Sequence, residues 1–364
     1  MKAAVISQGS TSSMMVIEAM KRYFDIVDQV QLKDIEVHLG KEAVILHEGK
    51  ELGQYDCVYV KGSFRYANLL RSIATLLEKK VPYMPLPAHC FTTVHNKLIT
   101  HLVLQQHNIP MPKTYISSST DAAKDILKRT HYPIVMKLPE GTQGKGVMFA
   151  DSYSSASSLL DALGVLKQPF IIQEYVDTGG SDVRALVVGD KVIAAMRRRA
   201  KSDEQRANIH AGGVGEPVTL TREVSALAVK TARALGADVC GVDILEGSLG
   251  PVVVEANISP GLQGLSKVTT IDLANEIAQF FHQQTEKVIL STKQQSTSNT
   301  MNELALQEDP SGCQEIITPL NFRGERIVLP EMVTRLAKLD ENKEYLLRLK
   351  KGSVEIKEFT VRNL

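Results

Sequence analysis

Residues 240–261, CGVDILEGSLGPVVVEANISPG, decide the fold of this chain. Two short runs rich in Val and Ile flank a Gly-Ser-Leu-Gly turn, a pattern that predicts a β-hairpin. Side chains alternate faces along a strand, so Glu255 and Asn257 share one face. If Asp243 lies opposite or diagonal to Glu255 on the partner strand, three oxygen ligands converge, and these suit Mg²⁺. A solvated sheet face carrying carboxylates is the alternative interpretation.

Composition excludes several classes of protein. Among 364 residues, 42 Lys and Arg oppose 41 Asp and Glu, so no bulk field draws the chain to nucleic acid or membrane. The four cysteines lie far apart without a C-x-x-C pair, which indicates neither disulfides nor a zinc site. No signal-peptide core or membrane-length apolar run is visible, so we expect a cytoplasmic protein. His95, His101 and His107 are expected at the surface or at helix caps.

The order of strands and helices predicts an α/β protein. A strand over 2–7, a helix over 14–23 and a strand over 55–60 precede the prolines of 81–87, which mark a domain boundary near residue 88. The free N–H groups that begin the first helix could hold an anionic substrate group, although the turn before them lacks the G-x-G-x-x-G pattern. Further helices are predicted over 92–107, 155–166, 221–235 and 271–284.

A glycine-rich loop is the first candidate for phosphate binding. A strand over 134–138 carries Lys137, and the loop GTQGKG follows at 141–146. Glycines let backbone N–H groups approach phosphate oxygens closely, and the lysine supplies a positive charge to them. A simple hairpin turn is the other interpretation of the same loop.

Two further segments carry polar residues on predicted strands. The apolar run PFIIQEYV, 169–176, ends in groups that can contact a base and a ribose. A second hairpin is predicted about the Gly189-Asp190 turn, with Asp182 and Arg198 on its strands. Arginine offers a fork to phosphate or carboxylate. A solvated charged face is the plainer alternative.

Taken in order, these segments resemble the ATP-grasp ligases, and within them the RimK-like glutamate ligases. The resemblance runs over about 90–285 and rests on PIVMKLPEGTQGKGV, QEYV, SDVRALVVGDKVIAAM, RANIHAGG, GVDIL and VVEANISPGL. It implies an α/β ATP-grasp fold with a Rossmann-like N-terminal domain. The implied division of the chain is 1–88 for that domain, 89–180 and 181–288 for the two ATP-grasp subdomains, 289–312 for a linker and 313–364 for a small β-rich module.

The resemblance also implies roles for single residues. Those implied to bind ATP are Lys97, Lys137, Gly141, Gln143, Gly144, Gly146, Glu174, Tyr175, Val176 and Asp182. Those implied to hold two Mg²⁺ ions, or Mn²⁺, are Asp243, Glu255 and Asn257. Arg206 and Asn208 are implied to lie by the transferred phosphoryl group, and Arg198 is a third candidate catalytic residue. Ala211 stands where the family pattern has Arg, which leaves substrate choice open.

The implied reaction joins a carboxylate to an amine through an acyl phosphate. We expect an amino acid, L-glutamate first, to be added to a protein terminus or a small-molecule acceptor. Extension of a coenzyme with γ-glutamyl units and ligation on an amino-group carrier in lysine biosynthesis remain alternatives within this fold. An ATP-sensing regulator with a DNA-binding or dimerising tail is the competing hypothesis of another class.

The carboxy-terminal stretch 313–364 resembles the swapped-hairpin modules of AbrB-like proteins. Such modules dimerise and often bind DNA. The stretch holds ten Lys and Arg against eight Asp and Glu, a net charge of +2, which is too small for a strong phosphate footprint. We therefore expect a homo-oligomer and not a DNA-binding protein.

Overall fold

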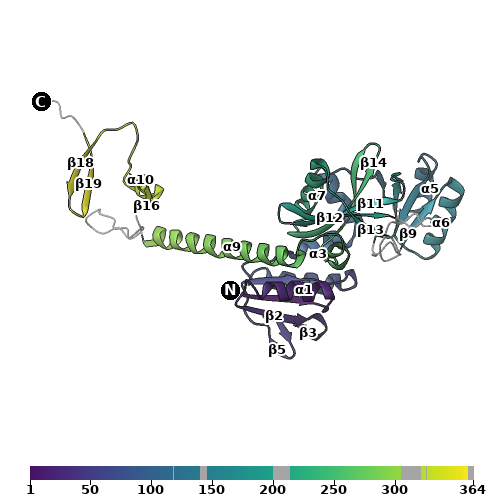
Figure 1. The fold of residues 1–364 in the computed structure, drawn as a ribbon, viewed down its shortest axis with the longest axis horizontal. Helices are drawn as coiled ribbons and strands as arrows, with labels where there is room; N and C mark the ends of the chain where they lie inside the picture. The colour runs from purple at the N-terminus through teal and green to yellow at the C-terminus, as the bar shows by residue number, and fades with distance from the viewer. Residues whose placement is uncertain (118, 140–145, 200–213, 305–320, 325, 360–364) are drawn as a thin grey trace. The chain divides into compact units, whose positions relative to one another are not determined.

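The computed structural model describes residues 1–364 except 118, 140–145, 200–213, 305–320, 325 and 360–364 (Figure 1). The chain divides into two compact units, Met1–Thr292 and Lys293–Leu364. Within the described residues no helix is both long and apolar enough to cross a membrane.

A parallel sheet of three strands opens the first unit. β1 (Lys2–Ser7) lies between β2 (Ile26–Gln31) and β6 (Cys57–Val60) and runs parallel to both. Helix α1 (Thr11–Met20) begins earlier than predicted because the Ser10 side chain accepts a hydrogen bond from the Ser13 N–H and caps it. The remaining elements of this region are η1 (Leu32–Asp34), β3 (Ile35–His38), β4 (Val44–His47), β5 (Lys50–Glu51), η2 (Phe64–Tyr66) and α2 (Ala67–Leu77).

The prediction of one continuous helix over 92–107 is wrong. Two helices occupy this stretch, α3 (Ala88–His95) and α4 (Lys97–Gln106). Asn96 separates them: its backbone is extended, and its side chain accepts hydrogen bonds from the first N–H groups of α4. Lys97 therefore stands at the start of a helix instead of within one.

A four-stranded antiparallel sheet follows, in the order β7-β10-β8-β9. Helices α5 (Thr120–Leu127) and α6 (Tyr153–Val165) cover it and form with it a hydrophobic core of its own (Figure 1). The strands are β7 (Thr114–Tyr115), β8 (Ile134–Lys137), β9 (Val147–Ala150) and β10 (Ile171–Glu174). The predicted strand over 134–138 is present and carries Lys137 as its last residue.

A five-stranded antiparallel sheet completes the first unit, in the order β13-β12-β11-β14-β15. Both predicted hairpins are confirmed, and Gly189 takes a positive φ of 61° in the turn between β11 and β12. The buried side chains of α7 (Arg222–Ala234) pack against this sheet. The other elements are β11 (Ser181–Val188), β12 (Lys191–Arg199), β13 (Val214–Pro217), β14 (Val239–Gly247), β15 (Gly250–Asn257) and α8 (Gln263–Ser266).

The closing helix is longer than predicted. α9 spans Leu273–Leu304, so the first part of the predicted linker is helical. Residues 285–304 contain neither Pro nor Gly, and nothing in them ends the helix. The second unit holds two hairpins and a short helix, formed by β16 (Asn321–Arg323), β17 (Arg326–Val328), α10 (Glu331–Leu336), β18 (Tyr345–Lys350) and β19 (Ser353–Glu358).

Candidate nucleotide and metal site

Asp243 and Glu255 face each other across the hairpin of β14 and β15. They are register partners, and Gly241 is the partner of Asn257, so all three predicted ligands lie on one face of the sheet. The Asp243 residue is 7% exposed. The side chain of Glu255 is 35% exposed. The amide oxygen of Asn257 accepts a hydrogen bond of 2.8 Å from the Ser259 N–H. The predicted position of Asp243 opposite Glu255, with Asn257 on the same face, is confirmed.

Arginines from the next two strands neutralise Asp243 on the same face. Arg184 donates from Nε and Nη2 to the two Asp243 oxygens, both at 2.7 Å. Arg198 Nη2 lies 2.8 Å from Asp243 Oδ2, and its Nε and Nη2 also donate to Asp182 at 2.6 Å. Burial opposes ionisation of Asp243, but the two guanidiniums outweigh it and hold its pKa at about 2. Asp243 is therefore ionised at neutral pH.

These side chains fit a hard cation. Two carboxylates and an amide oxygen on one face of this hairpin are the ligand types that Mg²⁺ takes in proteins. A carboxylate has about four acceptor positions, and the arginines use three of those on Asp243. Asp243 thus has one acceptor position left for a cation. Glu255 is half-buried, and its carboxylate is the more accessible of the two.

Two lysines reach this carboxylate edge from other elements. Lys97, the first residue of α4, places Nζ 4.0 Å from Glu255 Oε1. Lys137, at the end of β8, is buried. Burial lowers its pKa to about 8, against the opposing effect of Glu255. The four-stranded sheet and α4 thus bring positive charge to the carboxylates of the five-stranded sheet.

His101 anchors α4 and is not at the surface, so that prediction is wrong for this residue. The Gln173 amide donates to His101 Nε2 at 2.7 Å, which leaves the proton on Nδ1, the atom that faces the Lys97 carbonyl. Burial lowers the pKa of His101 to about 4, so the ring stays neutral. The first turn of α4, with Lys97, is thereby fixed to β10.

The predicted adenine segment follows β10. The Glu174 carboxylate accepts a hydrogen bond of 2.8 Å from the Tyr115 hydroxyl, and Lys113 lies 3.3 Å from it. The N–H of Glu174 donates to the Lys113 carbonyl and that of Tyr175 to the Pro133 carbonyl. Any adenine contact must therefore use the carbonyls of this segment or the N–H of a later residue.

Several predicted residues fall outside those that the structure describes. They are Gly141, Gln143, Gly144, Arg206, Asn208 and the departure at Ala211. Gly146 is described. It takes a φ of 77°, and its carbonyl accepts from the Leu138 N–H at the base of the loop. This backbone conformation explains the glycine at that position.

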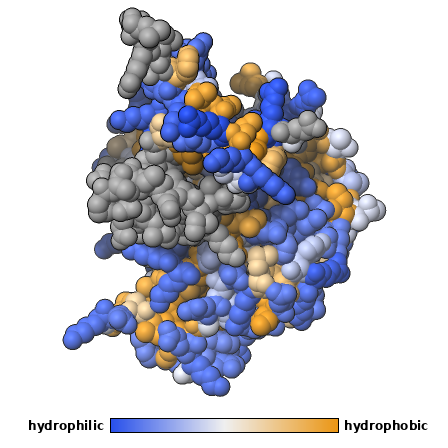
Figure 2. All heavy atoms as spheres, turned by 90° about the vertical axis from the view of Figure 1, so that its left-hand side faces the viewer, coloured by the Kyte–Doolittle hydropathy of each residue, from blue (hydrophilic) through white to orange (hydrophobic). Residues whose placement is uncertain are grey.

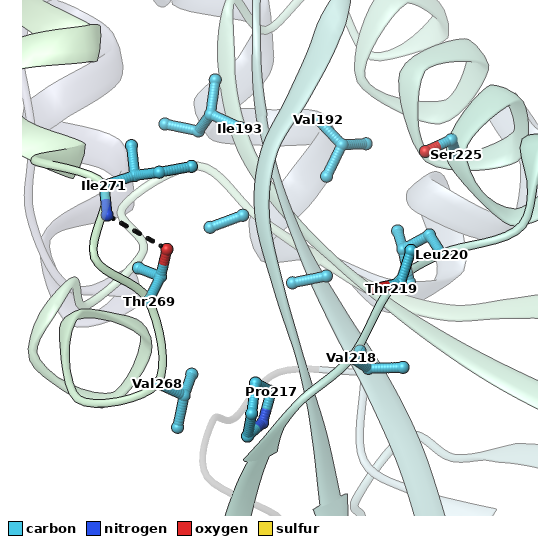
Figure 3. A pocket seen from close by; sticks show the side chains of 12 residues that line it. Val192, Ile193, Pro217, Val218, Thr219, Leu220, Ser225, Val268, Thr269 and Ile271 are labelled. Carbon is cyan, nitrogen blue, oxygen red and sulfur yellow. Dashed lines mark hydrogen bonds between the residues drawn. The ribbon is translucent and has the colours of Figure 1, made fainter.

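A surface pocket of about 570 Å³ lies apart from these residues (Figure 3). It adjoins the first half of β12, away from Arg198 near the end of that strand. Its lining carries no charged side chain and consists of Val192, Ile193, Ala194, Ala195, Pro217, Val218, Thr219, Leu220, Ser225, Val268, Thr269 and Ile271. Such a lining offers nothing to balance the charge of nucleotide phosphates.

Sequence reasoning did not predict the contacts of three residues. Arg184 pairs with Asp243 across neighbouring strands, His101 holds α4, and Lys61 is a buried lysine in the N-terminal sheet. Arg184 could have been found from strand alternation, since it lies two residues after Asp182 and so shares its face. No sequence signal pointed to the other two.

Two antiparallel sheets, one carrying carboxylates and one carrying a buried lysine, define the class: the fold is that of the ATP-grasp ligases. The ATP-grasp ligase PsnB with its minimal precursor matches with a TM-score of 0.62 at 18% identity, over 78% of this chain and 98% of that one. A RimK domain protein from Sphaerobacter thermophilus matches with a TM-score of 0.59 at 20% identity, over 77% and 99%.

The chain belongs to the RimK-like ATP-grasp family, whose model matches residues 94–281. A probable alpha-L-glutamate ligase of Vibrio atlanticus is 36% identical over 77% of this chain and 95% of its own length. The ribosomal protein bS6–L-glutamate ligase of Salmonella schwarzengrund is 35% identical, with the same two coverages of 77% and 95%. The protein is an ATP-dependent ligase, and members of its class use ATP and Mg²⁺.

Proposed function

We propose that this ligase adds L-glutamate to a carboxylate of a protein or small-molecule acceptor, and that it does so in the cytoplasm, where ATP is abundant. The amino acid is suggested by relatives named for L-glutamate ligation. Because one of them is named for a ribosomal protein, a protein terminus is our first choice of acceptor.

One observation carries the proposal: Lys97 lies 4.0 Å from Glu255, the register partner of Asp243, and the buried Lys137 is close enough to interact electrostatically with Glu255. This edge combines two carboxylates for a cation with two ammonium groups for phosphates. A site that only senses a nucleotide does not need both. A phosphoryl-transfer site does, because negative charge must be balanced on the attacking and the leaving oxygens.

We assign the nucleotide contacts as follows. Lys97, Lys137 and the glycine-rich segment 141–146 are assigned to the phosphates, and the backbone of 174–176 is assigned to adenine. Asp182 is assigned to the ribose. Its carboxylate already accepts two hydrogen bonds from Arg198, and these limit its contact with the ribose. Arg206 and Asn208 lie by the transferred phosphoryl group. Asp243, Glu255 and Asn257 hold the metal, with two Mg²⁺ ions as the expected complement and Mn²⁺ as a substitute.

The reaction proceeds in two steps. An oxygen of the acceptor carboxylate attacks the γ-phosphorus of ATP, the bond to the β-phosphate oxygen breaks, and ADP leaves. The amine of L-glutamate then attacks the acyl carbon, inorganic phosphate leaves, and the nitrogen loses a proton to give the amide. Bound Mg²⁺ supplies charge neutralisation at the phosphates. Lys97 and Lys137 orient and neutralise the same oxygens, and no protein nucleophile is required.

The test is a reaction of the purified full chain with ATP, Mg²⁺ and single amino acids, against peptide and coenzyme acceptors. Mass spectrometry follows the acceptor while phosphate release is measured. We expect stepwise gains of one glutamyl mass on one acceptor. Turnover with another amino acid corrects the substrate, and a protein that binds ATP without releasing phosphate overturns the proposal in favour of a sensor.

We also propose that the second unit joins two copies of the chain. Leu347 and Leu349 of β18 are register partners of Ile356 and Val354 on β19, so these four side chains share one face. They are 37% to 73% exposed. Figure 2 shows the hydropathy of one face of the molecule, on which hydrophobic residues lie in small groups among hydrophilic ones. A two-stranded hairpin is at best marginally stable alone, and a second copy would cover this face.

Substitution on that face tests the dimer. Leu347→Glu with Leu349→Glu should convert the full chain from a dimer to a monomer of 40.0 kDa, measured by size exclusion with light scattering. Leu346→Glu is the matched control, because Leu346 is exposed on the opposite face of the same strand. Unchanged mass in the double variant contradicts this interface.

A further inference from the structure

The carboxyl-end edge of the N-terminal sheet faces the loop that follows the candidate metal ligands. β1 and β6 end side by side there, and the Lys61 N–H donates to the Ile6 carbonyl. β1 is central, with β2 on one side and β6 on the other. The order in which strands are added to the sheet therefore reverses between β1 and β6. In open α/β sheets, ligands bind outside the carboxyl ends of the strands at such a point.

Lys61 is buried at this edge. It is 5% exposed, and its Nζ donates to the Pro260 carbonyl at 3.2 Å. Burial lowers the pKa of Lys61 to about 8, and no carboxylate in the described part of the chain raises it. An ammonium has three donors, and a buried charge is unfavourable unless an anion accompanies it. The surroundings of Lys61 therefore favour the arrival of an anion.

Three hydrogen bonds fix this edge to the loop after β15. Besides the contact of Lys61 with Pro260, the Gly62 N–H donates to Ser259 Oγ at 3.1 Å. The Leu262 N–H donates to Ser12 Oγ at 2.9 Å, in the first turn of α1. Ser259 in turn donates to Asn257. Lys61 is thus connected through a short, bonded segment to the metal end of the hairpin.

We propose that Lys61 binds a carboxylate of a substrate at this edge. The assignment rests on the proposed ligation, in which both the incoming amino acid and the acceptor carry carboxylates. It differs from the nucleotide contacts, because Lys97 and Lys137 approach Glu255 from α4 and β8, whereas Lys61 approaches from the N-terminal sheet. A carboxylate satisfies the Lys61 donors that are not bonded to any residue the structure describes, and it offsets the burial of the charge.

Calorimetric titration of the full chain loaded with Mg²⁺ and AMPPNP tests this site. The two probes are L-glutamate and the acceptor mimic acetyl-Glu-Glu, titrated separately. Lys61→Met should weaken binding of one probe about tenfold or more, the effect of losing one charge-assisted hydrogen bond. Lys61→Arg should stay near wild type, and affinity for the nucleotide should not change. The probe that loses affinity identifies which substrate Lys61 contacts.

Two further variants separate binding from structure. Lys61→Gln keeps a donor for the Pro260 carbonyl but has no charge, so it should weaken the same probe as Lys61→Met does. Lys80→Met removes an exposed lysine of the same region and should change nothing. The site is overturned if Lys61→Gln binds both probes as wild type does, or if the wild type binds neither probe. If probe binding depends on Lys61 but no amide is formed, the proposed ligation is overturned, whereas the carboxylate site at Lys61 is supported.

Discussion

The two antiparallel sheets differ in whether their buried charges are compensated by partners in the same sheet. In the five-stranded sheet, Asp182 and Asp243 are each bonded to guanidiniums of the same sheet, so the charges are balanced before any ligand arrives. In the four-stranded sheet, burial of Lys137 lowers its pKa to about 8, which shows that its charge is poorly compensated. The first arrangement fixes carboxylates in place, and the second favours binding of an anion.

The difference shows how a ligand site can be divided between two sheets. The carboxylates must stay ionised and oriented without a metal, and Arg184 and Arg198 achieve this for Asp243. The lysine gains most when phosphate oxygens replace the water it has lost. Perturbed groups of this kind gather at functional sites. The following changes test each side of the contrast.

Loss of the open carboxylate should have the largest effect. Glu255→Ala removes the more exposed of the two facing carboxylates, and we expect ATP turnover to fall by about 10³-fold or more while the fold persists. Phosphate release and circular dichroism measure the two properties. Glu246→Ala, on the same hairpin but paired with Arg197, is the control and should stay near wild type. An active Glu255→Ala variant contradicts the metal assignment.

Removal of the shared guanidinium should have the next largest effect. Arg198→Met leaves Asp182 and Asp243 buried with fewer partners, and breaking such a buried pair costs about 3 kcal/mol or more of unfolding free energy. Urea unfolding measures it. Arg197→Met removes the neighbouring, more exposed arginine that pairs with Glu246, and should cost about 0–1 kcal/mol. Equal losses in the two variants would mean that the buried chain of charges does not stabilise the sheet.

Activity of Arg198→Met answers a separate question, measured where the variant is still folded. Arg198 was predicted to be a catalytic residue, whereas the structure bonds it to two carboxylates. Near-normal turnover would assign it to the support of Asp243 alone. A loss of turnover in a stably folded variant would keep the catalytic prediction.

The sequence was sufficient where short-range rules decide the structure. Alternation along two strands joined by a tight turn places Asp243 opposite Glu255, and the structure has that register. The hairpin at Gly189 followed from the same rules. It was insufficient where a local bond interrupts a periodic pattern. The apolar spacing continues through Asn96, whose side chain nevertheless caps a new helix.

The sequence was also insufficient to predict contacts between residues that lie far apart in the chain. Arg197, Arg198 and Arg199 are consecutive, and only the central one reaches Asp182 and Asp243, because strand register selects which face is covered. Lys61 carries no motif at all. Its burial depends on Pro260, 199 residues later. Sequence patterns identify which residue types are available, but tertiary packing decides which of them are buried together.

Loss of the buried lysine should have a smaller effect than loss of Glu255. Lys137→Met removes one phosphate-binding charge, and we expect kcat/KM for ATP to fall by about 10²-fold, as when one preorganised donor is removed. Lys128→Met, at an exposed lysine that pairs with Asp125 of α5 on the same sheet, is the control. If both variants keep wild-type kcat/KM, the four-stranded sheet does not supply the phosphate contact.

The smallest expected effect is a dependence of ATP binding on pH. With a pKa of about 8, Lys137 is mostly charged at pH 7 and mostly neutral at pH 9, so the affinity for ATP should fall as pH rises, by up to about tenfold. Lys137→Arg stays charged throughout this range and should bind ATP almost independently of pH. Titration calorimetry at four pH values measures both proteins. The same slope in both would assign the titration to another group and would remove the contrast between the two sheets.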